Sequence, residues 1–323
     1  MRLQRIEQFI AVAEAGSIRG AARTLAMSQP ALTRALQQLE AELGVQLMQR
    51  GVRGILLTPA GSAFLARARV ASSEIGKAFD EARRSNENAS GLVTCGLSPV
   101  AASLLLPEMA VKLQAQRAGA RLRVMEMPPS ALLPQVRDGA VELAVTQRTR
   151  AGLDAGLRYR PLFEIQLRVA ARRGHPLAGM RELAELAGAQ WLAQTAPGIP
   201  DDITTQSFLA IGLPAPLPAV HWGSFMPSVF DLVAASDMLI TLTPPLLRSL
   251  VAAGKLIEIP LTQPLVPLRV GLYNRSDSQP TANARATAQI ITAIARRYAA
   301  SGELRDTTPL AAPAERRRSA RGR

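Results

Sequence analysis

Four polar side chains within the nine residues 29–37 carry the clearest chemistry in this chain. Gln29, Thr33, Arg34 and Gln37 would share one face of a helix, with Pro30 among them. Glutamine can hydrogen-bond to adenine N6 and N7, arginine can bridge guanine O6 and N7, and threonine can contact a thymine methyl group. The alternative is the ordinary solvated face of an amphipathic helix, so the surrounding elements must decide.

Those surrounding elements form a pattern of three short helices with a tight turn. Ser17 can cap a second helix over residues 18–25, and Ser28 can cap a third, whose first turn tolerates Pro30. The inner face of the third helix carries Leu32, Leu36, Leu39 and Leu43. This is the sequence form of a helix-turn-helix, in which the second helix of the motif enters the major groove of DNA. The context favours base reading and adds Ser28 to the predicted contact face.

Residues 45–58 predict a β-hairpin directly after the third helix. Two short apolar runs flank a turn that contains Arg50 and Arg53. Beside a helix-turn-helix such a hairpin is a wing, whose arginines would reach phosphates or a minor groove and add affinity more than sequence choice. The alternative is an ordinary exposed hairpin.

A long helix is predicted from Thr58-Pro59 to Arg84, with an apolar stripe that ends near Phe79. A winged domain of this size cannot bury the whole stripe, so pairing with a second copy in a coiled coil is expected. The polar run 85–90 then marks a hinge.

This order of elements resembles the LysR-type transcriptional regulators. The residues that carry the resemblance are Phe9, Ser17–Leu25, Ser28–Thr33, Gln38–Glu40, Leu43-Gly44, Arg50 and Leu57–Gly61. Met48 stands where the family usually has phenylalanine, and methionine can fill the same apolar gap. The resemblance covers residues 1 to about 300. It implies double-stranded DNA with a dyad-symmetric promoter site as partner, a homodimer assembling to a homotetramer, and contact with RNA polymerase.

The resemblance also divides the chain. It implies an N-terminal all-α winged helix-turn-helix at 1–58, a linker helix and hinge for dimerisation at 59–90, and an effector-binding domain at 91–301. From Gly91 the chain alternates apolar strands with helical segments, among them 104–116 and 282–300, which predicts an α/β region with a parallel sheet. The family adds a periplasmic-binding-protein-like arrangement of two subdomains, 91–162 with 268–300 and 163–267, with the effector between them.

Candidate effector contacts follow strand ends, because ligands of open α/β sheets bind beyond the carboxyl ends of strands. They are Ser98, Pro99, Thr146, Thr195, Pro197 and Phe225. Their hydroxyl groups could hold a carboxylate or sulfonate and their rings an apolar body, although each could equally be a plain helix cap. The runs 97–101, 135–139, 173–178 and 195–198 are similar to those of regulators of aromatic-sulfonate catabolism. They imply a small aromatic or carboxylic/sulfonic anion as effector.

The chain lacks the sequence patterns of common catalysts. It has no GxSxG, CxxC, HExxH or P-loop run, and its two histidines, His175 and His221, are far apart in sequence. His175 is expected in a surface turn, and Asp201-Asp202 is typical of a helix start. We therefore expect no enzyme, no cofactor and no metal. The alternative function is a cytoplasmic small-molecule-binding protein whose basic charge gives only non-specific nucleic-acid binding.

Composition agrees with a polyanionic partner. The 323 residues carry a net charge of +13. Residues 1–86 hold 12 basic and 7 acidic residues, and the segment 302–323 is expected to be a disordered basic tail. Cys95 is the only cysteine and lies in an apolar run, so a structural thiol in a reducing cytoplasm is expected. No signal peptide or membrane-spanning run is visible.

Overall fold

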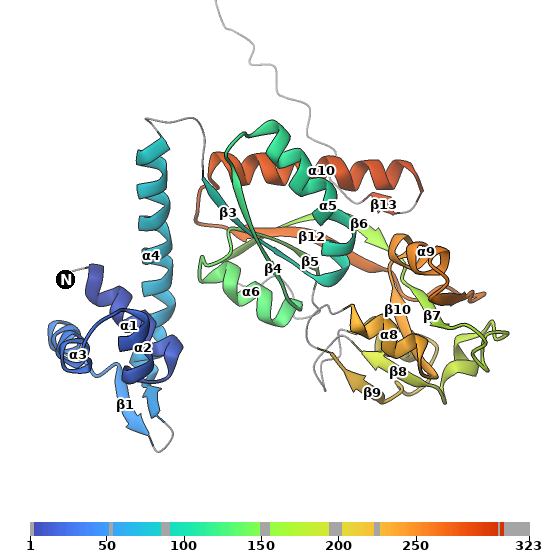
Figure 1. Ribbon diagram of the computed structural model, residues 1–323, viewed down its shortest axis with the longest axis horizontal. Helices are drawn as coiled ribbons and strands as arrows, with labels where there is room; N and C mark the ends of the chain where they lie inside the picture. Colours follow the sequence, from blue (N-terminus) through green and yellow to red (C-terminus); the bar gives the residue numbers. More distant parts are fainter. Residues whose placement is uncertain are drawn as a thin grey trace, which may run out of the picture.

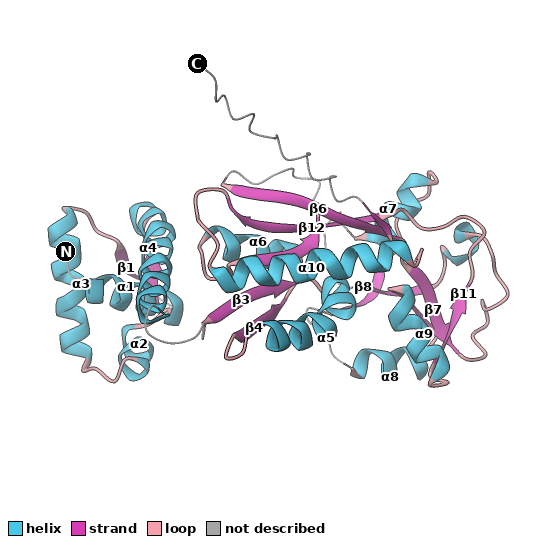
Figure 2. Cartoon of the chain, turned by 90° about the horizontal axis from the view of Figure 1, so that it is seen from above, coloured by secondary structure: helices cyan, strands magenta, loops and turns pink. Residues whose placement is uncertain are grey.

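A computed structural model of the chain describes residues 3–51, 54–84, 91–148, 156–193, 202–222, 227–302 and 304–306. Three parts lie in a row along the long axis of the molecule (Figure 2). A helical unit with a long helix comes first, a six-stranded α/β unit is central, and a five-stranded α/β unit lies at the far end. The expected tail beyond residue 306 lies outside the described residues.

The helical unit is the predicted winged helix-turn-helix. Its elements are α1 (Leu3–Ala15), α2 (Ile18–Thr24), α3 (Gln29–Leu43), β1 (Met48–Gly51) and β2 (Gly54–Leu57). The hydroxyl of Ser17 accepts a hydrogen bond from Gly20 N at 3.1 Å, and that of Ser28 accepts one from Ala31 N at 3.3 Å. These are the predicted N-caps. The buried core is Phe9, Val12, Ala21, Ala22, Leu32, Leu36, Leu39, Leu47 and Leu65.

Helix α4 (Pro59–Arg84) leaves the wing through a tightly packed junction. The Thr58 hydroxyl accepts from Gly61 N at 2.9 Å and donates to the Gln46 carbonyl at 2.7 Å. A Cβ at Gly61 would lie 1.9 Å from the carbonyl oxygen of Leu47, so only glycine fits there. The 26 residues of α4 extend over about 39 Å, and Figure 1 shows this helix standing beside the central unit.

The six-stranded unit has the strand order β13-β6-β12-β5-β3-β4. Its strands are β3 (Leu92–Leu97), β4 (Arg121–Glu126), β5 (Leu143–Gln147), β6 (Leu157–Ile165), β12 (Leu268–Arg275) and β13 (Arg305–Asp306). Helices α5 (Pro99–Gln116) and α10 (Ala282–Ala300) pack on one face, and α6 (Pro129–Arg137) packs on the other (Figure 1).

The five-stranded unit has the order β11-β7-β10-β8-β9. Its strands are β7 (Arg168–Arg172), β8 (Gln190–Ala193), β9 (Pro218–His221), β10 (Met238–Leu242) and β11 (Leu256–Ile259). Its helices are α7 (Ile203–Ala210), α8 (Ser228–Ala234) and α9 (Pro244–Ala252), with a 3-10 turn at Leu183–Leu186. Within the described residues, no helix has the length and apolar character needed to cross a membrane.

The sheets differ in two respects from the sequence-based expectations. Strands β3, β4 and β5 are parallel, but β6, β12 and β13 run antiparallel to their neighbours, so the sheet is mixed rather than parallel. Strand β6 continues to Ile165, which pairs with Leu268, whereas the first subdomain was expected to end at residue 162. The apolar run 162–165 resembles the start of a new strand, and only its pairing with β12 assigns it to the earlier one.

Candidate nucleic-acid interface and ligand pocket

The predicted contact face of α3 is exposed as one continuous surface. Gln29, Pro30, Thr33, Arg34 and Gln37 line a single shallow depression on the side of α3 opposite the buried leucines. All five are exposed except Thr33, which is half-buried, and Ser28 is exposed at the start of the helix. The helix therefore presents amide, hydroxyl and guanidinium groups at spacings that fit the edges of bases in a groove.

Two further cations that the sequence reasoning missed lie on the preceding helix. Arg19 and Arg23 of α2 are exposed, and within the described part of the chain neither they nor Arg34 form an ion pair. Their spacing of four residues on α2 was the available signal. In a helix-turn-helix the first helix crosses the DNA backbone, so these arginines suit phosphate contacts.

The wing is held against the helices by hydrogen bonds that its backbone N–H groups donate. The Glu40 carboxylate of α3 accepts hydrogen bonds from Leu47 N at 2.7 Å and from Met48 N at 3.0 Å, and Ile55 N donates to Gly16 O at 3.0 Å. Glu40 thereby fixes the start of the hairpin relative to α3. Arg50 lies in β1, although its side chain is not described, and Arg53 lies outside the described residues.

A pocket lies where the two α/β units meet. It has about 630 Å³ of empty space, counting the part open to solvent. Its lining comes from both units and from the two chain crossings between them: Pro99, Val100, Pro128, Pro129, Gln147, Leu167, Leu192, Asp202, Ile203, Trp222, Ile240, Thr241 and Leu268. A ligand here would contact both units at once.

Of the predicted effector contacts, one lines this pocket directly. Pro99 does so, whereas Ser98 and Thr146 are fully buried beside it. Ser98 caps α5, and its hydroxyl accepts from Ala101 N at 3.4 Å. The Thr146 hydroxyl donates to Oε1 of Gln147 at 3.2 Å, and Gln147 lines the pocket. Thr195, Pro197 and Phe225 lie outside the described residues.

Gln147 was not predicted from the sequence, although it directly follows a predicted contact. Because its side-chain oxygen accepts from Thr146, its amide N–H groups are left to donate toward a ligand. The remaining unpredicted lining is mostly apolar, and about half of it, Trp222 included, comes from elements of the five-stranded unit. Those residues become neighbours of Pro99 only through the way in which the two units pack.

Three helices begin at this pocket. Pro99 and Val100 open α5, Pro129 opens α6, and Asp202 caps α7 with its carboxylate accepting from Thr205 N at 2.9 Å. Helix N-termini favour negative charge. Asp202 is the only charged side chain among the described lining residues, and it already neutralises the start of α7. The starts of α5 and α6 therefore offer the electrostatically favourable end for an anion.

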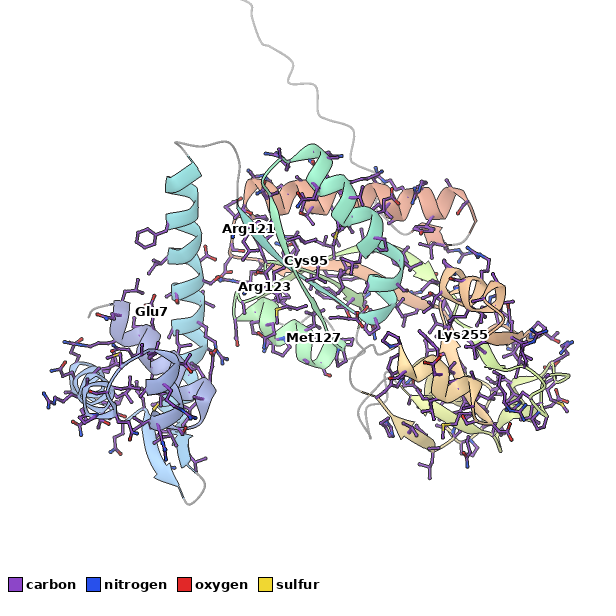
Figure 3. All side chains as sticks on the ribbon, viewed as in Figure 1. Glu7, Cys95, Arg121, Arg123, Met127 and Lys255 are labelled. Atoms are coloured by element: carbon purple, nitrogen blue, oxygen red, sulfur yellow. The ribbon has the colours of Figure 1, made fainter. Side chains whose placement is uncertain are left out.

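The titratable groups that could suggest catalysis have structural roles instead. His175 is buried rather than on the surface as expected: its Nδ1 accepts from Leu177 N at 3.0 Å, and its Nε2 lies 3.1 Å from the Asp237 carbonyl. Cys95 is fully buried in the six-stranded sheet (Figure 3), and burial raises its pKa to about 12. Among the described side chains no group of acidic, histidine or cysteine residues could hold a metal ion.

Two known family models match successive parts of the chain. Residues 3–62 match the bacterial regulatory helix-turn-helix protein of the lysR family, and residues 86–296 match the LysR substrate binding domain. The chain belongs to the LysR family of transcriptional regulators. It is therefore a DNA-binding transcriptional regulator with an effector-binding domain, and not an enzyme.

Individual relatives of this LysR-type regulator are distant. It is 29% identical to the transcriptional regulator GalR of Pseudomonas putida over 274 residues, which is 84% of this chain and 69% of that protein. It is 27% identical to PcaQ of Agrobacterium fabrum over 284 residues, 87% of this chain and 91% of PcaQ. The crystal structure of full-length CbnR with its target DNA has the same fold, with a TM-score of 0.63, 22% identity, and coverage of 92% and 99% of the two chains. These relatives do not resolve the subfamily.

Proposed function

We propose that this regulator reads a dyad-symmetric promoter site with α3 and senses a small aromatic or carboxylic/sulfonic anion between its two α/β units. The DNA-binding part of this proposal rests on the exposed face formed by Gln29, Thr33, Arg34 and Gln37. This face is separate from the residues that anchor α3 in the core of the helical unit. Arginine and glutamine are suited to bidentate contacts with guanine and adenine. Ser28 and Pro30 lie at the start of this face, closest to the turn.

Phosphate contacts come from the flanks of this face in the proposed complex. Arg19 and Arg23 approach the backbone from α2, while Arg50 and Arg53 of the wing reach phosphates or the minor groove. Such contacts add affinity that falls with salt and carries little sequence information. The net charge of +13 strengthens the same non-specific term.

The effector-binding part of the proposal rests on the residues that line the pocket. Leu167, Leu192, Trp222, Ile240 and Leu268 form an apolar wall suited to an aromatic body. The starts of α5 and α6, with the amide of Gln147, favour a carboxylate or sulfonate in the same pocket. Thr195, Pro197 and Phe225 are proposed to complete the site, because they follow predicted strand ends.

Calorimetry with the full-length protein tests the ligand class. Benzoate and p-toluenesulfonate are the anionic probes, and benzylamine and a neutral hexose are the competing classes. We expect only the anions to bind. Gln147→Ala should weaken their binding about 10- to 100-fold, the size expected for a hydrogen bond to a charged group. Gln166→Ala is the matched control, because Gln166 is exposed and does not line this pocket. If benzylamine or the hexose bound and neither anion did, the proposal of an anionic effector would be rejected.

Oligomerisation is proposed to occur through α4. Phe79 lies on this helix and is 59% exposed, which is unusual for a large apolar side chain on a helix of 26 residues. Pairing with α4 of a second copy would cover it and set two α3 helices at a fixed spacing for a dyad-symmetric site. Two such dimers would form the tetramer, and we propose the cytoplasm as its compartment and RNA polymerase as a further partner.

A further inference from the structure

Two elements run from the ligand pocket to the linker helix α4. Helix α6 begins at the pocket with Pro129, and the turn that follows its last residue contacts α4. Strand β12 likewise begins at the pocket with Leu268 and ends at Arg275, beside α4. At the usual rise per residue α6 is about 13 Å long and β12 about 25 Å. Both are regular elements packed in the six-stranded unit, so a movement at one end is carried to the other.

The end of α6 is joined to α4 by two polar contacts, and a third contact joins α4 to α1. Ser73 Oγ donates to the Gly139 carbonyl at 2.7 Å, and Nη1 of Arg69 bonds to Oδ2 of Asp138 at 3.2 Å. The other terminal nitrogen of Arg69, Nη2, bonds to Oε1 of Glu14 in α1 at 3.2 Å. Arg69 thus joins the effector-binding domain, the linker helix and the helix-turn-helix in one chain of contacts.

The end of β12 makes the second connection. Nη1 of Arg275 lies 3.4 Å from Oε1 of Glu74 in α4, and its Nε bonds to Oδ1 of Asp277 at 2.9 Å. The Arg275 side chain is only 8% exposed, so its position is fixed by its surroundings. Its hydrogen bond also holds the pKa of the Asp277 carboxyl below the ordinary range. Arg275 therefore presents a charge to α4 from a rigid site.

Close approach at this surface depends on a glycine. Gly139 has a φ of +78°, and a Cβ there would lie 3.3 Å from both Ser73 Oγ and Arg275 Nη1. The contacts described between α4 and these two ends are hydrogen bonds and ion pairs. Such contacts at a partly exposed surface break and re-form at little cost, unlike a packed apolar core. We call Arg69, Ser73 and Glu74, with Asp138, Gly139 and Arg275, the polar latch.

We propose that the polar latch couples the ligand pocket to the DNA-binding unit within one chain. Ligand binding shifts the pocket ends of α6 and β12, these elements move their far ends at the latch, and α4 changes its angle to the six-stranded unit. The inference rests on the proposed function of the pocket and of α3. Linkage requires the converse as well: DNA that fixes α4 must alter the pocket through the same contacts.

Trp222 provides a readout that needs no identified effector. It lines the pocket, whereas the chain's other tryptophan, Trp191, is buried against Phe208 and is not among the lining residues. The experiment measures acrylamide quenching of tryptophan fluorescence in the full-length protein, with and without its footprinted promoter duplex. We expect the duplex to change the quenching constant, and Trp222→Phe to remove that change, which assigns the signal to the pocket.

The latch is tested with the double variant Ser73→Ala/Glu74→Gln and with Gly139→Ala. Both should keep duplex binding in a parallel gel-shift assay but lose the quenching response. Ser72→Ala is the matched control on the neighbouring residue of α4 and should keep the response. A response that persists in both latch variants, or one that is missing from the wild-type complex, overturns the coupling. Absence of duplex binding by the wild type is a separate result and overturns the proposed function with it.

Discussion

At the scale of single residues, α3 divides its side chains between folding and binding. Leu32, Leu36 and Leu39 are buried in the helical core, and Ser28 caps the helix with its hydroxyl. The exposed polar side chains on the opposite face make no contribution to that core. Changes to the exposed face are therefore expected to alter DNA binding and leave folding intact.

Arg34→Ala should weaken binding to the specific site by about 1–3 kcal/mol if its guanidinium reads a guanine edge. The measurement is a titration of the variant against the specific duplex and against random DNA. Arg121→Ala is the matched control for lost charge, because Arg121 is exposed on the edge strand β4, remote from α3 (Figure 3). Equal losses on both duplexes would assign Arg34 to a phosphate instead.

Cys95 should be inert in the native protein. Burial, with a smaller effect of Glu142, raises its pKa from 9.0 to about 12, so at pH 8 the thiolate is roughly a thousandfold scarcer than in the unfolded chain. The rate of iodoacetamide alkylation, native against guanidinium-denatured, measures this. The thiol favours the folded state below pH 9, and that contribution is lost as the pH rises from 9 toward 12. Rapid native alkylation at pH 8 would contradict this account.

The residues of the ligand pocket show how far sequence reasoning reaches. The pattern of a strand end followed by a helix start identified Pro99, which lines the pocket. A predicted strand end also identified Thr146, whose hydroxyl donates a hydrogen bond to the side chain of Gln147. Asp202 was interpreted only as part of a helix start, and Trp222 was not named as a candidate contact. Their place in the pocket depends on how two units fold against each other, and no local pattern encodes that. The polar face of α3 was predictable because one helix carries all of it, whereas Arg19 and Arg23 of α2 were missed.

At the scale of elements, the junction between wing and linker helix depends on one glycine. The Thr58 hydroxyl joins the loop at Gln46 to the first turn of α4, and Gly61 lets the backbone pass the Leu47 carbonyl. The sequence predicted the cap at Thr58 from its Thr-Pro pair. It did not predict the reason for Gly61, because the clashing carbonyl is 14 residues earlier in the chain.

Gly61→Ala should destabilise the helical unit by about 1–3 kcal/mol, the usual size for overpacking. Gly76→Ala is the matched control in the same helix. No atom lies within 4 Å of where its Cβ would be, so this substitution should stabilise α4 by about 0.5–1 kcal/mol. Chemical denaturation of the full-length variants, followed by circular dichroism, compares the two. Equal stability of the two variants would contradict the packing described for the junction.

The sequence predicted some helices and strands of the effector-binding domain and missed others. Helix α10 was predicted with its observed ends, because its apolar residues recur along a long helix capped by Thr281. Helix α5 begins at Pro99, five residues before the expected Leu104, because Ser98 caps it. Helix α9 and strand β11 had no prediction. Both are short, with Pro244 and Pro245 opening the helix, and periodicity is weak over so few residues.

At the scale of the whole molecule, three units are linked by few connections. Two chain crossings join the α/β units around the pocket, and the polar latch joins the central unit to α4. A ligand can change DNA binding only if it prefers one arrangement of these units over another. The order of domains followed from the family resemblance, whereas the latch depends on contacts between residues as distant as Glu74 and Arg275.

The central claim is sequence-specific DNA binding through the helix-turn-helix. The most direct test is footprinting of the purified full-length protein on the intergenic DNA beside its own gene, at two salt concentrations and with random-sequence competitor. We predict a protected, dyad-symmetric site that is retained in excess competitor at both salt concentrations. Binding abolished equally by salt and by competitor would contradict the claim. The basic charge would then carry the interaction, and the chain would be a small-molecule-binding protein with only non-specific affinity for nucleic acid.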